Sequence, residues 1–191
     1  MNKKQLLQQY NEFLTRKTGF DPDILDHCLK EFLGTSGSSY QLMTDGASSG
    51  NPGPAGAGIL IKKEGKAVSQ HSYSLGIATN NEAEYWALII GLYHLISNNK
   101  NCTVHHVTDS ELLARQMKGI YRVKNERIKT LWKTAQNLIQ LISGYEVTSL
   151  PREHLGEADS LAREGSQAGQ TSGFEKIKKH LKAKGFLEER A

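Results

Sequence analysis

The sequence has few cysteines and no long apolar run, and both absences limit the class of protein. Its two cysteines, Cys28 and Cys102, stand far apart and form no Cys-x-x-Cys or Cys/His spacing. This predicts free thiols in a reducing compartment and argues against a zinc site. No apolar run is long enough to cross a bilayer, and residues 1–9 lack the apolar core of a secretory signal. We therefore expect a cytoplasmic protein with no membrane partner.

Length and composition are those of an ordinary globular protein. The chain has 191 residues, which is enough for one domain with its own core plus small additions. Hydrophobic residues make up 38% and charged residues 23%, as in many soluble domains. The net charge of +4 fits a polyanionic partner, but a modest positive charge more often serves solubility. Charge alone therefore does not identify a partner.

Changes in composition divide the chain into five segments. They are a helical N-terminal extension (1–34), a linker (35–39), a main domain (40–168), a second linker (169–173) and a basic helical tail (174–191). The extension could dock on the core, bind a partner or drive dimerisation, and the sequence does not choose. In the tail, Phe174, Ile177 and Leu181 form an apolar stripe at helical spacing, which favours a helix docked on the core. The tail lysines leave open a second role, a handle for nucleic acid.

The main domain is predicted to be α/β with a mixed sheet. Strand-like runs and helical periodicity alternate along it. Strands are expected at 40–44, 56–62, 67–75, 103–108 and 145–150, and helices at 82–97, 110–117, 125–142 and 157–166. Three strands in a meander, followed by alternating helices and strands, are typical of a mixed sheet with flanking helices.

Four acidic residues stand in four separate short motifs of this domain. Asp45 follows the first strand in Met-Thr-Asp-Gly, and Asp109 follows the fourth strand in Val-Thr-Asp-Ser. A right-handed crossover would make these two strands parallel neighbours, so both aspartates would lie at one edge of the sheet. Glu84, in Thr-Asn-Asn-Glu-Ala-Glu, and Asp159, in Glu-Ala-Asp-Ser-Leu-Ala, would approach that edge from two helices.

Clustered carboxylates repel one another, and their pKa values should be raised unless a cation is bound. Ligands that are all oxygen suit Mg²⁺ or Mn²⁺. Two such cations about 4 Å apart can hold both the attacking and the leaving oxygen of a phosphodiester. Any one of these acids would by itself be taken for a helix cap or a surface charge. That interpretation is much weaker for all four together.

In the identity and order of these motifs, residues 40–167 resemble the catalytic domain of type 1 ribonuclease H. The resemblance implies a ribonuclease H-like fold, a five-stranded mixed sheet flanked by helices. It also implies hydrolysis of the RNA strand of RNA–DNA hybrids with two Mg²⁺ or Mn²⁺ ions and no organic cofactor. The products would carry 5′-phosphate and 3′-hydroxyl ends. The residues that match the catalytic and metal-binding acids of the family are Asp45, Glu84, Asp109 and Asp159.

Further residues are candidates for contact with nucleic acid. They are Ser49, Gly50, Asn51, Thr79, Asn80 and Asn125. In the family, the loop after the first strand offers backbone groups to RNA 2′-hydroxyls, for which glycines allow a close approach. The start of the long helix offers N–H groups that favour phosphate. Each site also has a plainer interpretation, a tight turn for the loop and helix capping for the Thr and Asn residues.

Two features depart from the family pattern. Several bacterial members carry a His ten residues before the last aspartate, where this chain has Ser149. His154 lies only five residues before Asp159, and it is either an auxiliary group or a surface residue. Residues 118–124 form a short link where many members have a basic handle.

Two alternative functions stay open. One is a hybrid-binding module without catalysis, against which the presence of all four acids argues. The other is a related nuclease that acts on double-stranded RNA or on RNA–DNA junctions.

Overall fold

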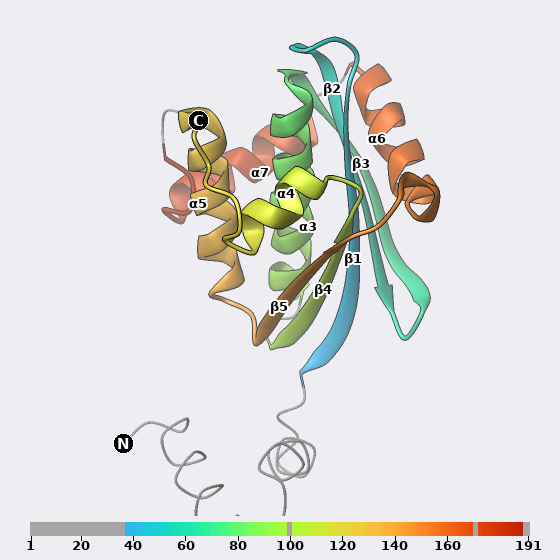
Figure 1. Cartoon of the computed structure of the whole chain (residues 1–191), viewed down its shortest axis with the longest axis vertical. Helices are drawn as coiled ribbons and strands as arrows, with labels where there is room; N and C mark the ends of the chain where they lie inside the picture. The colour runs from blue at the N-terminus through green and yellow to red at the C-terminus, as the bar shows by residue number, and fades with distance from the viewer. Residues whose placement is uncertain (1–36, 99–100, 170–171, 189–191) are drawn as a thin grey trace, which may run out of the picture. The chain divides into compact units, whose positions relative to one another are not determined.

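The structure of the chain, a computed structural model, describes residues 37–98, 101–169 and 172–188. The helices predicted within 1–34 lie outside the described residues. Figure 1 shows the unit formed by Ser38–Ala191 as a central sheet with helices on both of its faces. In the part of the chain that the structure describes, no helix is long and apolar enough to cross a membrane.

The sheet has five strands in the order β3-β2-β1-β4-β5. They are β1 (Ser38–Ser48), β2 (Gly53–Lys63), β3 (Lys66–Ala78), β4 (Cys102–Thr108) and β5 (Gly144–Ser149). Strands β1 to β3 form an antiparallel meander, while β4 pairs in parallel with both β1 and β5. The predicted mixed sheet is therefore confirmed. So is the parallel contact between the strand that carries Asp45 and the strand that precedes Asp109.

Helices cover both faces of this sheet. They are α3 (Asn80–Asn98), α4 (Glu111–Met117), α5 (Glu126–Ile139), α6 (Gly156–Gln167) and α7 (Ser172–Ala183), with a short 3₁₀ turn η1 (Arg152–His154). Helix α6 lies on one face, and α3 with α5 and α7 lies on the other (Figure 1). Helix α3 has twelve buried residues because it is enclosed between the sheet and the outer helices.

Local capping residues explain where three of the helices begin. Ser110 caps α4 and Asn125 caps α5, each through its side-chain oxygen. At α3, the backbone N–H of Thr79 donates to Glu82 Oε2 (2.8 Å), and Glu82 N donates to Thr79 Oγ1 (3.3 Å). This reciprocal capping box uses Glu82 to hold the helix start. The nearby Glu84 is left free for another role.

Strand β1 is longer than the 40–44 predicted, and this is the main correction to the strand boundaries. The predicted strands leave residues 45–55 between them, but Ser48 pairs with Ala55 and β2 already begins at Gly53. The connecting turn is therefore only four residues long. Pairing of β1 with β4 ends earlier, at Met43 and Val107. Beyond that point, β1 continues as one strand of the hairpin with β2.

The C-terminal tail packs on the core of this unit, as its apolar stripe predicted. Phe174, Ile177 and Leu181 are all buried, and the Phe174 ring meets the Trp86 ring edge to face at 4.8 Å. Each predicted linker overlaps a neighbouring element of the structure. Residues 38–39 belong to β1, and residues 172–173 belong to α7.

Candidate active site

Three of the four acidic residues meet at one edge of the sheet. Carboxylate oxygens of Asp45, Glu84 and Asp109 lie within 4.8 Å of one another. They come from β1, from the first turns of α3 and from the residue after β4. The two aspartates lie close together because β1 and β4 run in parallel side by side.

The close approach of β1 and α3 depends on Gly46. A Cβ atom at this position would lie 2.2 Å from Glu84 N and 2.4 Å from the carbonyl carbon of Ala83. Only a residue without a side chain lets the helix backbone pass so near the strand. The Gly46 N–H also donates a hydrogen bond to the Glu84 carboxylate. Gly46 therefore sets both the distance and the orientation of Glu84 relative to Asp45.

Glycines in β2 likewise let a helix, α6, approach the sheet closely on its opposite face. Gly58 pairs with Asp45, and a Cβ atom there would lie 2.0 Å from Ala158 O of α6. A Cβ atom at Gly56 would lie 2.2 Å from Ala162 O. Because α6 rests directly on the β2 backbone, Asp159 is carried toward the carboxylate cluster.

The cluster is short of positive charge. The pKa of Asp45 is raised to about 7 by burial, and then by the charges of Asp109 and Asp159. Burial, followed by the charges of Asp45 and Asp109, raises the pKa of Glu84 well above its usual range. Asp45 Oδ2 and Glu84 Oε2 are buried and have no hydrogen-bond partner among the described residues. Orphaned carboxylate oxygens of this kind fit a divalent cation.

Asp159 is near the cluster but is bound differently. Its carboxylate forms ion pairs with Arg152 of η1 and with Arg163 of α6, the latter at 3.1 Å. Burial acts to raise the pKa of Asp159, but hydrogen bonds and charge from the two arginines outweigh it and lower that pKa. The cluster of three acids therefore does not include Asp159, although its charge still acts on Asp45.

An open cleft of about 410 Å³ gives access to these groups. Its lining includes Asp45, Glu84, Asp109, Ser49, Asn80, Arg152 and Arg163. The sequence had not singled out the two arginines. The four-residue spacing of Asp159 and Arg163 on one helix was a usable signal for the second of them. No local pattern pointed to Arg152.

Comparison with known proteins places this arrangement in a family. A family model described as reverse transcriptase-like matches residues 43–165. Ribonuclease HI of Halobacterium salinarum is 34% identical over 121 residues, which cover 63% of this chain and 60% of the relative. Ribonuclease H of Legionella pneumophila is 36% identical over 112 residues, 53% of this chain and 76% of the relative. The chain belongs to the ribonuclease H family.

A solved ribonuclease H structure agrees with this assignment. The crystal structure of LC11-RNase H1 in complex with an RNA/DNA hybrid superposes with a TM-score of 0.65 at 34% identity. The match covers 68% of this chain and 97% of that structure. The chain spans only about 60% of the length of the Halobacterium relative, so the likeness concerns the ribonuclease H domain.

The loop residues predicted to meet substrate lie beside the cleft of this ribonuclease H domain. Ser49 and Asn80 line it. Asn51 connects the β1–β2 turn to α3, because its Oδ1 accepts a hydrogen bond from Asn80 N at 3.2 Å. Gly50 has a φ of 105°, which favours glycine. Thr79 caps α3, so its plainer interpretation is confirmed, and a role in binding remains a prediction.

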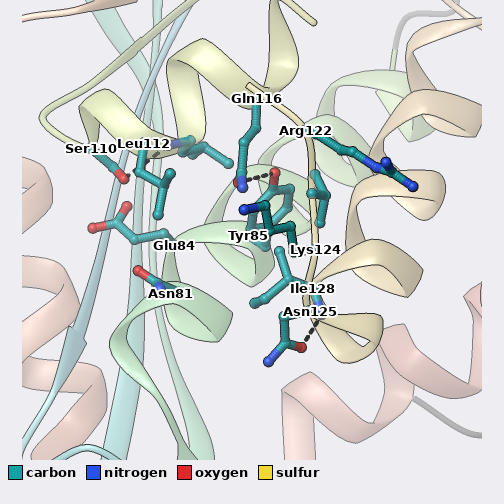
Figure 2. A pocket seen from close by; sticks show the side chains of 12 residues that line it. Asn81, Glu84, Tyr85, Ser110, Leu112, Gln116, Arg122, Lys124, Asn125 and Ile128 are labelled. Atoms are coloured by element: carbon teal, nitrogen blue, oxygen red, sulfur yellow. Dashed lines mark hydrogen bonds between the residues drawn. The ribbon is translucent and has the colours of Figure 1, made fainter. Parts of the chain in front are cut away.

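A second pocket of about 290 Å³ shares Glu84 with the cleft (Figure 2). Its lining includes Asn81, Glu84, Tyr85, Ser110, Gln116, Arg122, Lys124 and Asn125. Within it, the Tyr85 hydroxyl donates to Gln116 Oε1 at 2.9 Å. Asn125 caps α5, as its plainer interpretation predicted, and also lines this pocket. His154 is exposed on η1 and lines neither the cleft nor this pocket.

Proposed function

We propose that this chain is a metal-dependent endonuclease that hydrolyses the RNA strand of RNA–DNA hybrids. One observation carries the proposal: a cluster of three carboxylates opens to a cleft in a domain of the ribonuclease H family, and two of them, Asp45 and Glu84, are buried with an oxygen that has no hydrogen-bond partner among the described residues. The hybrid bound to LC11-RNase H1, a solved relative at 34% identity, supports the same substrate for this chain. A cytoplasmic location stays a prediction.

Asp45, Glu84 and Asp109 would hold the cations, with Asp159 as a fourth ligand. We propose that the cations are Mg²⁺ or Mn²⁺, because the four candidate ligands all offer carboxylate oxygens. We propose two of them, because a pair of cations can hold both the attacking and the leaving oxygen of a phosphodiester. The chemistry that such cations supply is activation of water and stabilisation of charge on the leaving 3′ oxygen. The products would carry 5′-phosphate and 3′-hydroxyl ends.

The chain's own residues prepare this site before a substrate arrives. Burial and mutual repulsion keep Asp45 and Glu84 costly to ionise, so a cation gains affinity by relieving that repulsion. The Gly46 N–H holds Glu84 in place. Arg152 and Arg163 form ion pairs with Asp159, and they would be available to bind the phosphates of the substrate strand if Asp159 served as a cation ligand.

The surroundings of the cleft suit a nucleic-acid strand. Ser49, Gly50 and Asn51 form a short turn whose backbone groups would meet RNA 2′-hydroxyls. The Asn51–Asn80 hydrogen bond fixes this turn to the start of α3, where backbone N–H groups favour phosphate. Asn125, in the second pocket, would contact the strand beyond Glu84.

A panel of labelled duplexes tests the proposal. Hybrid, double-stranded RNA, an RNA–DNA junction and double-stranded DNA are each incubated with protein and Mg²⁺ or Mn²⁺, with the label on either strand. The expected result is cutting of the RNA strand of the hybrid. The fragments should carry a 5′-phosphate, so their mobility should change when a phosphatase removes it. Cutting of double-stranded RNA at an equal rate would favour the wider nuclease. Tight hybrid binding without cutting would favour the binding module.

A further inference from the structure

A buried histidine, His106 of β4, connects three strands through its ring nitrogens. Its Nε2 lies 2.8 Å from Thr44 Oγ1 of β1, and its Nδ1 lies 2.9 Å from the Tyr145 hydroxyl of β5. His106 and Thr44 are both fully buried. Burial, and then the charge of His105, lowers the pKa of His106 to about 3. The neutral ring donates through one nitrogen and accepts through the other, so both hydrogen bonds form without a buried charge.

The connection lies where backbone pairing between β1 and β4 stops. The paired register of these strands ends at Met43 and Val107. Thr44 is the next residue of β1, and Asp45 follows it directly. Strand β4 remains paired with β5 as far as Thr108, the residue before Asp109. The Thr44–His106 hydrogen bond therefore joins β1 to the β4–β5 pair one residue before Asp45 and three residues before Asp109.

We infer that Thr44, His106 and Tyr145 form a positioning tie that holds Asp45 against Asp109 and so prepares the cation site. Like charge on Asp109 repels Asp45, and this repulsion acts to separate β1 from β4 at the point where they are no longer paired. The tie opposes the separation from within the core. None of its three residues lines the cleft. The inference rests on the proposed function, because it concerns the same carboxylates.

The experiment compares cation affinity in matched variants. Thr44→Val keeps the shape of the side chain and removes the hydroxyl, and Tyr145→Phe cuts the other end of the tie. Thr134→Val is the control, because Thr134 is also buried and its hydroxyl donates to backbone carbonyls in α5 and at Phe186. Binding of Mn²⁺ is measured by calorimetry well below the melting temperature of every variant.

We expect Thr44→Val and Tyr145→Phe to weaken Mn²⁺ binding about tenfold, the lower end of the effect of residues that support metal ligands. Thr134→Val should lose stability but keep the wild-type Kd. His106→Gln should bind Mn²⁺ more tightly than His106→Leu, because its amide can still donate and accept. If Thr44→Val does not fold, Tyr145→Phe still decides the question, since Tyr145 is only half-buried.

Two outcomes overturn the inference in different ways. Equal Mn²⁺ affinity in wild type, Thr44→Val and Tyr145→Phe would refute the tie and leave the proposed function intact. A wild-type chain that binds no divalent cation would refute the proposed function, and the tie with it.

Discussion

Gly46 and Glu84 are in direct backbone contact, with 2.2 Å between Glu84 N and the position that a Cβ of residue 46 would occupy. The contact joins strand β1 to helix α3 at the point where each contributes one carboxylate. The geometry of the proposed cation site is therefore decided by a residue without a side chain.

Gly46→Ala should open this contact, because the methyl group would meet backbone atoms that cannot rotate away. We expect a loss of about 1–3 kcal/mol in the free energy of unfolding. Hybrid cleavage should fall more than tenfold, because an outward shift of Glu84 of about 1 Å is enough to misplace it. Urea denaturation and a cleavage assay measure the two effects. Gly156→Ala is the control, since nothing lies within 4 Å of the Cβ it would add; cleavage that falls equally in both variants would contradict the argument.

Asp45→Asn should stabilise the protein in the presence of a chelator while abolishing cleavage. The folded-state pKa of Asp45, about 7, lies above its ordinary value of 3.8, so wild type loses stability as pH rises from about 4 to about 7. The uncharged variant escapes this loss. Its advantage in melting temperature should therefore be small near pH 4, grow toward pH 7 and stay constant above it. An advantage that is the same at every pH would show that Asp45 is not held in a repulsive cluster.

Arg152→Gln should tighten cation binding and weaken hybrid binding. It removes one of the two ion pairs of Asp159, and it removes a positive charge that lowers the pKa of Asp45. Because Arg152 is more than half exposed, we expect only about a twofold to fivefold tighter Kd for Mn²⁺. The slope of the logarithm of the hybrid binding constant against the logarithm of the salt concentration should fall by about one, as expected for the loss of one phosphate contact. Arg127→Gln serves as the control, because Arg127 is exposed and lies 4.0 Å from Glu82. A weaker Mn²⁺ affinity in Arg152→Gln would show that Arg152 does not oppose cation binding at this site.

Phe174→Ala should show that α7 is part of the folded unit. The ring is buried against Trp86, so its removal should cost about 3–5 kcal/mol of the free energy of unfolding. Lys176→Ala, on the exposed side of the same helix, should change stability by less than about 0.5 kcal/mol. Denaturation curves that coincide for wild type and Phe174→Ala would mean that the tail does not dock. The role of the tail lysines in nucleic-acid binding stays a prediction.

Much of the fold was predictable because its signals are local. Capping residues such as Ser110 and Asn125 mark the starts of helices, and the Phe174 stripe has a clear helical period. The parallel contact that brings Asp45 near Asp109 followed from the handedness of crossover connections. These features depend on residues near one another in sequence, or on a general rule of topology.

Other features depend on packing between distant segments and were missed. Strand β1 continues past Asp45 because β2 pairs with it, and a glycine-rich stretch gave no sign of that pairing. Arg152 lies only seven residues before Asp159, but the two residues pair across the junction of η1 and α6, which no helical spacing predicts. The hydrogen bond from Asn80 to Asn51 spans 29 residues. Such contacts follow from the assembled sheet, and no short motif encodes them.

The most direct test of the account is cleavage of a hybrid with labelled RNA, measured against Mg²⁺ and Mn²⁺ concentration for wild type and Asp45→Asn. Wild type should cut only the RNA strand, EDTA should stop the reaction, and Asp45→Asn should bind the hybrid but not cut it at any cation concentration. Glu111→Gln, which removes an exposed carboxylate on α4, should behave like wild type. Cutting in EDTA, or full activity of Asp45→Asn, would show that the carboxylate cluster does not hold catalytic cations.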